Sequence, residues 1–214
     1  MADSELWLAR VRMNARNAQV RRDLRGVEDL HRTVMSMFPD IESESPREEM
    51  GVLHRLDIVN ERPVLLVQTN REPNLSALAE GYGDVAVVSL RTLFEKLEPG
   101  VAVRYRLLVN ATKRPKTGEM AGKRVALGAA DTVKWWGERA PSVGLTLAEE
   151  PTTVKDTLTG GSSQGAKVTL RPWRLDGVAD VADVEKLEAG VRAGIGRGRA
   201  YGCGLLSLAL LRVE

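Results

Sequence analysis

The sequence predicts an α+β protein built from two consecutive domains. Segments with an apolar residue at every second position, the spacing of a half-buried strand, alternate with segments whose apolar residues recur at helical spacing. The order strand, helix, strand, strand, helix, strand occurs within residues 1–90 and again within residues 101–214. Because that order is typical of ferredoxin-like domains, the expected fold is two tandem ferredoxin-like (RRM-like, βαββαβ) domains.

The first copy of the pattern is clearest in its opening strand and helix. Val27, Leu30 and Val34 recur at the spacing of one helix face, and Pro39 ends that helix. Asn74 marks the start of a second, shorter helix. The expected elements, in order, are a strand over 6–13, a helix over 27–38, a hairpin of strands over 51–58 and 63–68, a short helix over 75–80 and a strand over 85–89.

The second copy follows a connection that ends in Pro99 and Gly100. Residues 91–100 are expected to form a linker between domains 1–90 and 101–214. Asp131 is the expected N-cap of the first helix, and segment 154–158 is expected to join the central hairpin. The expected elements are a strand over 101–109, a helix over 131–138, strands over 143–148 and 166–173, a helix over 181–191 and a strand over 205–211.

The composition excludes several classes of protein. Hydrophobic residues make up 43% and charged residues 28%, as in an ordinary globular protein. No apolar run reaches the roughly 18–20 residues of a membrane-spanning helix, and no secretory signal is recognisable. Cys203 is the only cysteine, which excludes an intrachain disulfide and favours the reducing cytoplasm. Two histidines and one cysteine are too few for a usual zinc site, so no metal and no small-molecule cofactor is expected.

Positive charge is concentrated in two segments although the net charge is only +2. Residues 8–25 contain six arginines and one acid, and residues 101–124 contain seven basic residues and one acid. Acidic residues gather elsewhere, chiefly in 40–49. Segregated charge of this kind indicates a polyanionic partner.

The C-terminal segment 190–204 is rich in glycine and arginine. Glycines stand at 194, 196, 198, 202 and 204, and no acid occurs from 192 to 212. Glycine lets the backbone approach a ligand closely, and exposed N–H groups beside Arg197 and Arg199 suit a phosphate. The spacing matches neither a dinucleotide-binding loop nor a P-loop. The alternative is a flexible connection between a helix and a strand.

Several separate segments together resemble one known family, and they keep that family's order along the chain. They are 7–11 (Trp-Leu-Ala-Arg-Val), 21–24 (Arg-Arg-Asp-Leu), 29–33 (Asp-Leu-His-Arg-Thr), 110–114 (Asn-Ala-Thr-Lys-Arg), 122–127 (Gly-Lys-Arg-Val-Ala-Leu) and the glycine-rich ending 194–208. The chain resembles the CasE-type CRISPR repeat-RNA endoribonucleases of the RAMP superfamily, which are subunits of type I-E (Cascade) complexes. The resemblance implies an enzyme that cuts the repeat RNA at the 3′ base of its stem-loop without a metal and then holds the product.

Such a cleavage begins when a ribose 2′-hydroxyl attacks the adjacent phosphate, so it needs a base, an acid and cations. His31 is the expected acid–base residue, because imidazole titrates near neutrality. The family commonly has a tyrosine three residues earlier, where this chain has Glu28, which is expected to orient the imidazole or raise its pKa. The alternative is that His31 is a solvent-facing helix residue. His54, inside an apolar strand, is expected to be packed and to have no chemical role.

Basic side chains and loop glycines are expected to hold the RNA backbone. Trp135 and Trp136 are expected in the core and at its rim rather than stacked on bases. For segment 113–124 the alternative is a solvated charged loop. The expected RNA-binding residues are Arg21, Arg22, Arg25, Lys113, Arg114, Lys116, Lys123, Arg124, Gly194, Gly196, Arg197, Gly198 and Arg199.

Two functions of different classes remain open from the sequence. The first is an endoribonuclease that works with other Cascade subunits on a CRISPR repeat RNA stem-loop. The second is a catalytically inactive RNA-binding subunit on the same scaffold, which the departure at Glu28 favours and the presence of His31 opposes. A small-molecule-binding regulator would explain neither the charge segregation nor the glycine-rich ending.

Overall fold

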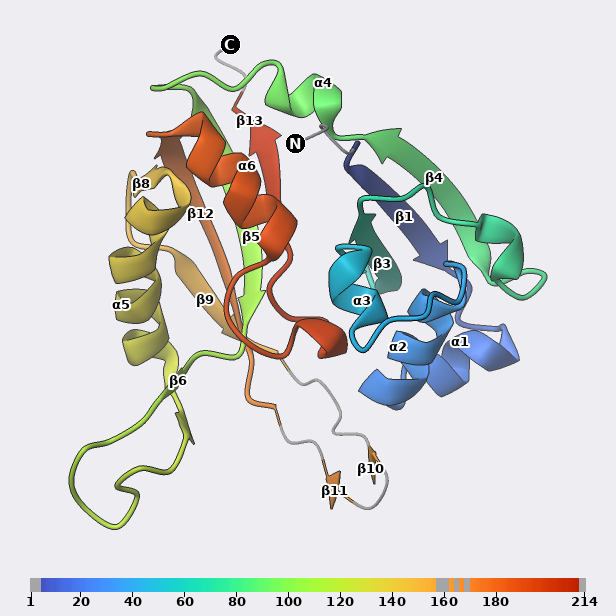
Figure 1. Ribbon diagram of the computed structural model, residues 1–214, viewed down its shortest axis with the longest axis horizontal. Coiled ribbons are helices and arrows are strands. Elements are labelled where there is room, and N and C mark those ends of the chain that lie inside the picture. Colours follow the sequence, from blue (N-terminus) through green and yellow to red (C-terminus); the bar gives the residue numbers. More distant parts are fainter. Residues whose placement is uncertain (1–4, 157–161, 164–165, 168–169, 212–214) are drawn as a thin grey trace.

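The computed structural model describes residues 5–156, 162–163, 166–167 and 170–211. It has two structural units: an N-terminal unit, residues 5–89, and a C-terminal unit, the described residues from 90 onward. Each unit has its own antiparallel sheet, and the two sheets lie side by side (Figure 1). Among the helices of the described ranges, none is long and apolar enough to cross a membrane.

The N-terminal unit is built on a four-stranded antiparallel sheet. Ala9, Val11 and Met13 alternate along the first strand and are buried, whereas the residues between them are not. Asn60 and Glu61 have φ of 48° and 62°, so they form the tight, left-handed turn of the central hairpin. The sheet has the order β2-β3-β1-β4, with β1 Trp7–Met13, β2 Leu53–Val59, β3 Arg62–Thr69 and β4 Gly83–Ser89.

One face of this sheet is covered by short helices. The expected stripe Val27, Leu30 and Val34 is buried against the sheet, as the sequence predicted. The helix expected over 75–80 is only a single 3-10 turn, because Asn74 caps it and the chain is already extended at Leu78. Two further helices were not expected from the sequence. The helical elements are α1 Ala18–Asp23, α2 Val27–Met35, α3 Pro46–Glu49 and η1 Leu75–Ala77.

The connection between the two sheets is folded and packed. It contains the short helix α4, Arg91–Phe94. Leu97 is 5% exposed and belongs to the core of the C-terminal unit, as does Leu6 from the start of the N-terminal unit. The connection is therefore attached to the core of the C-terminal unit through the Leu97 side chain.

The C-terminal unit contains a second antiparallel sheet, of five strands. Its order is β13-β5-β12-β8, and β9 also pairs with β12. The strands of this sheet are β5 Ala102–Val109, β8 Leu145–Leu147, β9 Thr152–Lys155, β12 Trp173–Val181 and β13 Leu206–Leu210. The remaining elements are β6 Thr112–Lys113, β7 Val125–Ala126, α5 Ala129–Arg139, η2 Ala140–Val143, β10 Ser162–Ser163, β11 Ala166–Lys167, α6 Val184–Ala193 and η3 Arg199–Tyr201.

The sequence placed the longest strand of this sheet too early. A strand was expected over 166–173, of which 168–169 lie outside the described residues, but the central strand β12 begins at Trp173, directly after Pro172. Proline cannot donate to a strand ladder, so it separates the long strand from the short one before it. The segment expected over 154–158 is the strand β9, and residues 157–158 lie outside the described residues.

Two helix starts in the C-terminal unit also differ from expectation. α6 begins at Val184 rather than at 181, because the Asp183 side chain accepts a hydrogen bond from the Lys186 N–H and caps the helix there. α5 begins after Gly128, so Asp131 is not the N-cap. Asp131 lies instead in the first turn, where it forms an ion pair with Lys113 at 2.9 Å.

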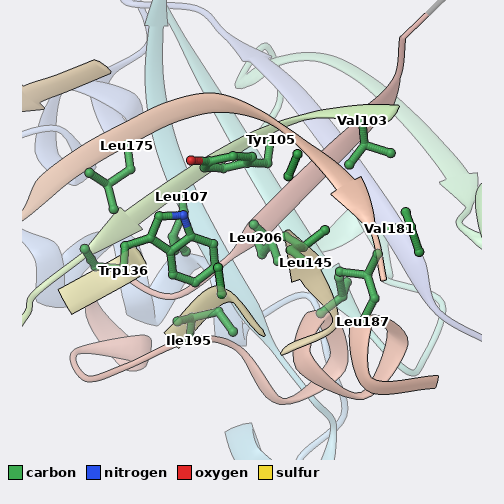
Figure 2. Packing of buried hydrophobic residues seen from close by; sticks show 14 of the residues in the cluster. Val103, Tyr105, Leu107, Trp136, Leu145, Leu175, Val181, Leu187, Ile195 and Leu206 are labelled. Atoms are coloured by element: carbon green, nitrogen blue, oxygen red, sulfur yellow. The ribbon is translucent and has the colours of Figure 1, made fainter. Parts of the chain in front are cut away.

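The core of the C-terminal unit is centred on Trp136. Its side chain, on α5, is fully buried, and its ring centre lies 5.8 Å from that of Tyr105 on β5 of the same unit (Figure 2). The preceding residue, Trp135, is only partly buried, and the Arg139 guanidinium lies 4.9 Å from its ring centre. The tryptophan pair therefore serves the core and its rim, as predicted from the sequence.

A buried arginine joins the two units. Arg55, 2% exposed, lies on β2 and forms an ion pair with Asp57 at 3.0 Å on the same strand. Its guanidinium also donates to the carbonyl oxygens of Arg106 and Leu205, each at 3.1 Å, and to the Ser207 hydroxyl at 2.9 Å. These three acceptors belong to the C-terminal unit, so one side chain uses its planar set of donors to fix the relative position of the two sheets.

We expect Arg55→Met to lower the free energy of unfolding by about 3–5 kcal/mol, because it leaves the buried Asp57 carboxylate without its main partner. Urea unfolding measures this loss. The double variant Arg55→Met/Asp57→Leu removes both charges and should regain most of it. The control Arg62→Met changes an exposed arginine of the same sheet and should alter the free energy by less than about 0.5 kcal/mol. A loss below about 1 kcal/mol for Arg55→Met would mean that the joint does not depend on this charge.

Candidate active site

His31 lies on α2 at the edge of the buried stripe. The helix packs Leu30 and Val34 into the core, which leaves His31 half-buried at the border between the helix and the C-terminal unit. Glu28 lies one turn earlier on the same helix. The buried atoms His31 Nδ1 and Glu28 Oε1 have no hydrogen-bond partner among the described residues, so the carboxylate does not hold the imidazole in this structure.

The second histidine of the chain lies beside the first. His54 on β2 is 1% exposed, and its ring centre is 6.2 Å from that of His31 with an angle of 27° between the ring planes. Burial, followed by the positive charges of His31 and Arg47, lowers the pKa of His54 to about 3. His54 is therefore packed, as the sequence suggested, and is a neutral ring at physiological pH.

The glycine-rich loop, residues 194–204, lies against both histidines. It connects α6 with β13 and reaches across to α2 and β2 of the N-terminal unit (Figure 1). A Cβ added at Gly194 would lie 2.8 Å from the Leu53 methyl carbons, and one at Gly204 would lie 2.8 Å from the Ile195 carbonyl oxygen. Both glycines have positive φ, so these two positions need glycine for packing and for conformation alike.

The loop brings a tyrosine to His31. Tyr201 ends the short helix η3, and its ring centre lies 6.4 Å from that of His31 with an angle of 60° between the planes. The sequence analysis did not single out this residue, because nothing in the spacing of the loop relates it to a helix about 170 positions earlier.

Two arginines add positive charge to the same place. Arg47 on α3 is fixed by donating to the Val52 carbonyl oxygen at 2.9 Å and by an ion pair with Glu48 at 2.8 Å. Burial, and next the charge of Arg47, lower the pKa of His31 below its ordinary value. Burial also lowers the pKa of Arg47, and Arg199 of the glycine-rich loop lowers it further against the opposite effect of Glu48. Arg47 was missed in the sequence because it is the one base in the acidic stretch 40–49.

The basic segment 113–124 forms an exposed arm between β6 and β7 (Figure 1). Its five predicted phosphate-binding residues, Lys113, Arg114, Lys116, Lys123 and Arg124, are all exposed. The strands β6 and β7 hold the base of the arm together. The pKa of Arg124 is lowered, first by the charge of Arg197 in the glycine-rich loop, then by burial and by the charge of Arg114.

The three arginines predicted near α1 lie elsewhere. Arg21, Arg22 and Arg25 are exposed at the end of α1, on the opposite side of the molecule from the arm between β6 and β7 (Figure 1). Arg22 forms ion pairs with Asp23 at 3.2 Å and Asp29 at 3.8 Å. The structure therefore separates these arginines from the other predicted RNA-binding residues.

The described residues contain no group of three His, Cys, Asp or Glu side chains arranged as metal ligands. Cys203 is a free, buried residue of the glycine-rich loop, and burial raises the pKa of its thiol to about 12, so it remains protonated. What the two units bring together is one titratable imidazole, several cations and a loop with positive-φ glycines. This combination suits acid–base chemistry on a phosphodiester.

Comparison with known proteins identifies the family to which the chain belongs. The family model described as CRISPR associated protein matches residues 6–209. The CRISPR-associated endoribonuclease Cse3 of Thermus thermophilus is 34% identical over 95% of this chain and 100% of its own length. The structure of Thermus thermophilus Cse3 bound to an RNA representing a pre-cleavage complex has a TM-score of 0.78 at 33% identity, over 96% of this chain and 99% of that chain.

A third similar structure is a chain of a CRISPR RNA-guided surveillance complex in a pre-nicking state. It has a TM-score of 0.69 at 34% identity and covers 96% of this chain and 100% of that chain. The family model spans nearly the whole chain, and these relatives agree with it. The chain therefore belongs to the family of CRISPR-associated proteins.

Proposed function

We propose that the protein is an endoribonuclease that cuts the stem-loop of a CRISPR repeat RNA in the cytoplasm and then remains bound to the product within an RNA-guided surveillance complex. The relatives support this, since one is named an endoribonuclease, one was solved with a pre-cleavage RNA and one in a surveillance complex. The observation that carries the proposal is that His31 meets the glycine-rich loop where the two units join.

We also propose that the two units are ferredoxin-like domains, residues 1–90 and 101–214, connected by 91–100. The support is the strand order. In the N-terminal sheet, and in the C-terminal sheet once β9 is left aside, the fourth strand in chain order lies beside the first, the first beside the third and the third beside the second. The short η1 replaces the second helix of the first domain.

In the proposed reaction His31 moves the proton. The 2′-hydroxyl of the nucleotide before the cut attacks the adjacent phosphorus and loses its proton, while the 5′-oxygen of the next nucleotide leaves and gains one. Arg47 and Arg199 are the cations that offset the extra negative charge on the phosphate in the transition state. Glu28 is kept as a candidate for orienting His31 once RNA is bound. The residues present provide for this reaction without a metal ion, which is part of the proposal.

RNA binding is assigned to two groups of residues. The arm carrying Lys113, Arg114, Lys116, Lys123 and Arg124 is proposed to grip the phosphates of the stem, because its cations are exposed. The glycine-rich loop, with Gly194, Gly196, Arg197, Gly198 and Arg199, is proposed to hold the phosphates near the cut. Arg21, Arg22 and Arg25 would contact a more distant part of the RNA.

A catalytically inactive RNA-binding subunit is the second candidate, since no hydrogen bond joins Glu28 to His31.

We expect the wild-type protein to cleave its repeat RNA in EDTA, and a 2′-deoxy nucleotide at the cut to stop cleavage while binding persists. His31→Ala should slow single-turnover cleavage by about 10²–10⁴-fold with little change in affinity. Wild-type cleavage that needs Mg²⁺ and ignores the deoxy sugar would contradict the mechanism, and no cleavage at all would favour the inactive subunit.

The pKa of His31 should respond to Arg47. Removing this cation in Arg47→Met removes one of the two causes that lower the pKa, so the value should rise, and the limb of the pH–rate profile that reports His31 should move to higher pH. NMR titration of the free protein measures the pKa directly, because the other histidine, His54, stays neutral above about pH 4. Arg32→Met is the matched control, an exposed arginine next to His31 in sequence whose removal should leave the pKa unchanged. An unchanged value in Arg47→Met would leave burial as the sole cause.

The glycine-rich loop should be needed for RNA and not only for folding. Gly198 has φ of 78°, and an added Cβ would have room, 3.5 Å from Cys203, so Gly198→Ala introduces backbone strain of about 1–2 kcal/mol without a clash. We expect it to reduce stem-loop affinity roughly 5–30-fold as the loop relaxes. Gly100→Ala introduces comparable strain at φ of 91° away from the loop and should lower the melting temperature without changing affinity. If both variants lose only stability, the loop glycines serve the fold alone.

A further inference from the structure

The backbone around Tyr201 is fixed on both sides. Its N–H donates to the Gly198 carbonyl oxygen at 2.9 Å, and the N–H of Cys203 donates to the same oxygen at 3.2 Å. Gly198 and Gly202 hold φ of 78° and 87° at the two ends of this turn. The next residue, Cys203, is fully buried, so the turn is anchored in the protein while the Tyr201 side chain stays half-buried at the surface.

The ring of Tyr201 lies beside the imidazole of His31. The centre distance of 6.4 Å and the tilt of 60° are those of an edge-to-face aromatic pair. His54 flanks the same imidazole at 6.2 Å, so His31 lies between a neutral buried ring and a phenol. These three rings come from α2, β2 and the glycine-rich loop, which meet only in the folded protein.

The Tyr201 hydroxyl is not occupied by the protein. The contrast is Tyr82, whose hydroxyl donates to the Asp23 carboxylate at 2.8 Å and so serves the fold. The hydroxyl of Tyr201 makes no hydrogen bond to another residue within the described part of the chain. A phenol donates as well as accepts a hydrogen bond, whereas an ionised carboxylate such as that of Glu28 only accepts.

We propose that Tyr201 is a catalytic residue whose hydroxyl donates a hydrogen bond to a non-bridging oxygen of the scissile phosphate beside His31. The proposal rests on the proposed endoribonuclease function. The bond from the 2′-oxygen to phosphorus forms, the bond from phosphorus to the 5′-oxygen breaks, and the proton lost by the 2′-hydroxyl is balanced by the one that the 5′-oxygen gains. Tyr201 keeps its proton throughout and stabilises the oxygen on which negative charge increases.

Tyr201→Phe tests the hydroxyl alone, because it preserves the ring and its packing. The assay is single-turnover cleavage of the CRISPR repeat RNA of the protein's own host, with affinity measured on the same RNA carrying a 2′-deoxy nucleotide at the cut. We expect the rate to fall roughly 10²-fold, in the range for loss of one oxyanion donor, with affinity unchanged within about twofold. Tyr105→Phe, which removes a hydroxyl from the core of the C-terminal unit, should cleave as the wild type does.

A sulfur-substituted phosphate identifies the oxygen involved. Sulfur is a weak hydrogen-bond acceptor. With one of the two phosphorothioate isomers at the cut, the loss of cleavage rate caused by Tyr201→Phe should therefore shrink to less than about tenfold. The two changes would then be non-additive, because both remove the same contact. An undiminished effect with both isomers would overturn the assignment to a non-bridging oxygen.

His31→Ala in the same assay separates the two proposals. If His31→Ala is inactive and Tyr201→Phe cleaves as the wild type does, the Tyr201 proposal is wrong and the endoribonuclease mechanism stands. If His31→Ala cleaves normally, the proposed mechanism itself fails. A loss of rate in Tyr201→Leu but not in Tyr201→Phe would assign the tyrosine ring to packing and would equally overturn the catalytic role.

Discussion

The buried guanidinium of Arg55 is the interaction on which the geometry of the site depends. His31 belongs to the N-terminal unit and Tyr201 to the C-terminal unit, so their distance is set by how the two sheets are joined. Arg55 reaches from β2 to two backbone carbonyls and a hydroxyl of the second sheet, and Asp57 balances its charge. Because a guanidinium is planar and its donors have fixed directions, this joint constrains orientation as well as distance.

The electrostatics of the site depend on burial and on the charge of Arg47, which belongs to the same unit as His31. Burial and Arg47 lower the pKa of His31, so the free imidazole is mostly neutral near pH 7 and able to accept a proton. His54 contributes differently. Its folded pKa of about 3 lies below the ordinary value of about 6.5. Between these two pH values His54 is protonated in the unfolded chain and neutral in the folded protein. The contribution of His54 to the free energy of unfolding is therefore fully present above about pH 6.5, and it is lost as the pH falls from there to about 3.

The sequence predicted much of the fold because the determinants are local. The stripe Val27, Leu30 and Val34 and the alternation in β1 report burial directly, and both were confirmed. The errors arose where a single residue outweighed periodicity. Pro172 moved the start of β12, and Asp183 moved the start of α6. The short α1 and α3 were missed because one or two turns of helix carry no measurable period.

The residues of the candidate site likewise fall into those that the local sequence marks and those that only tertiary packing brings together. His31, the arm and the glycine-rich loop could be predicted because each is marked by residue type or by clustering in the sequence. Arg47, His54 and Tyr201 could not be related to His31 in this way, since their proximity is produced by tertiary packing between segments up to about 170 residues apart. The loop glycines make that packing possible. A side chain at Gly194 would collide with Leu53, and the loop could then not lie against β2. The loop that is proposed to hold the phosphate therefore also brings the phenol close to the imidazole, so the proposed binding and the observed positioning share one structural cause.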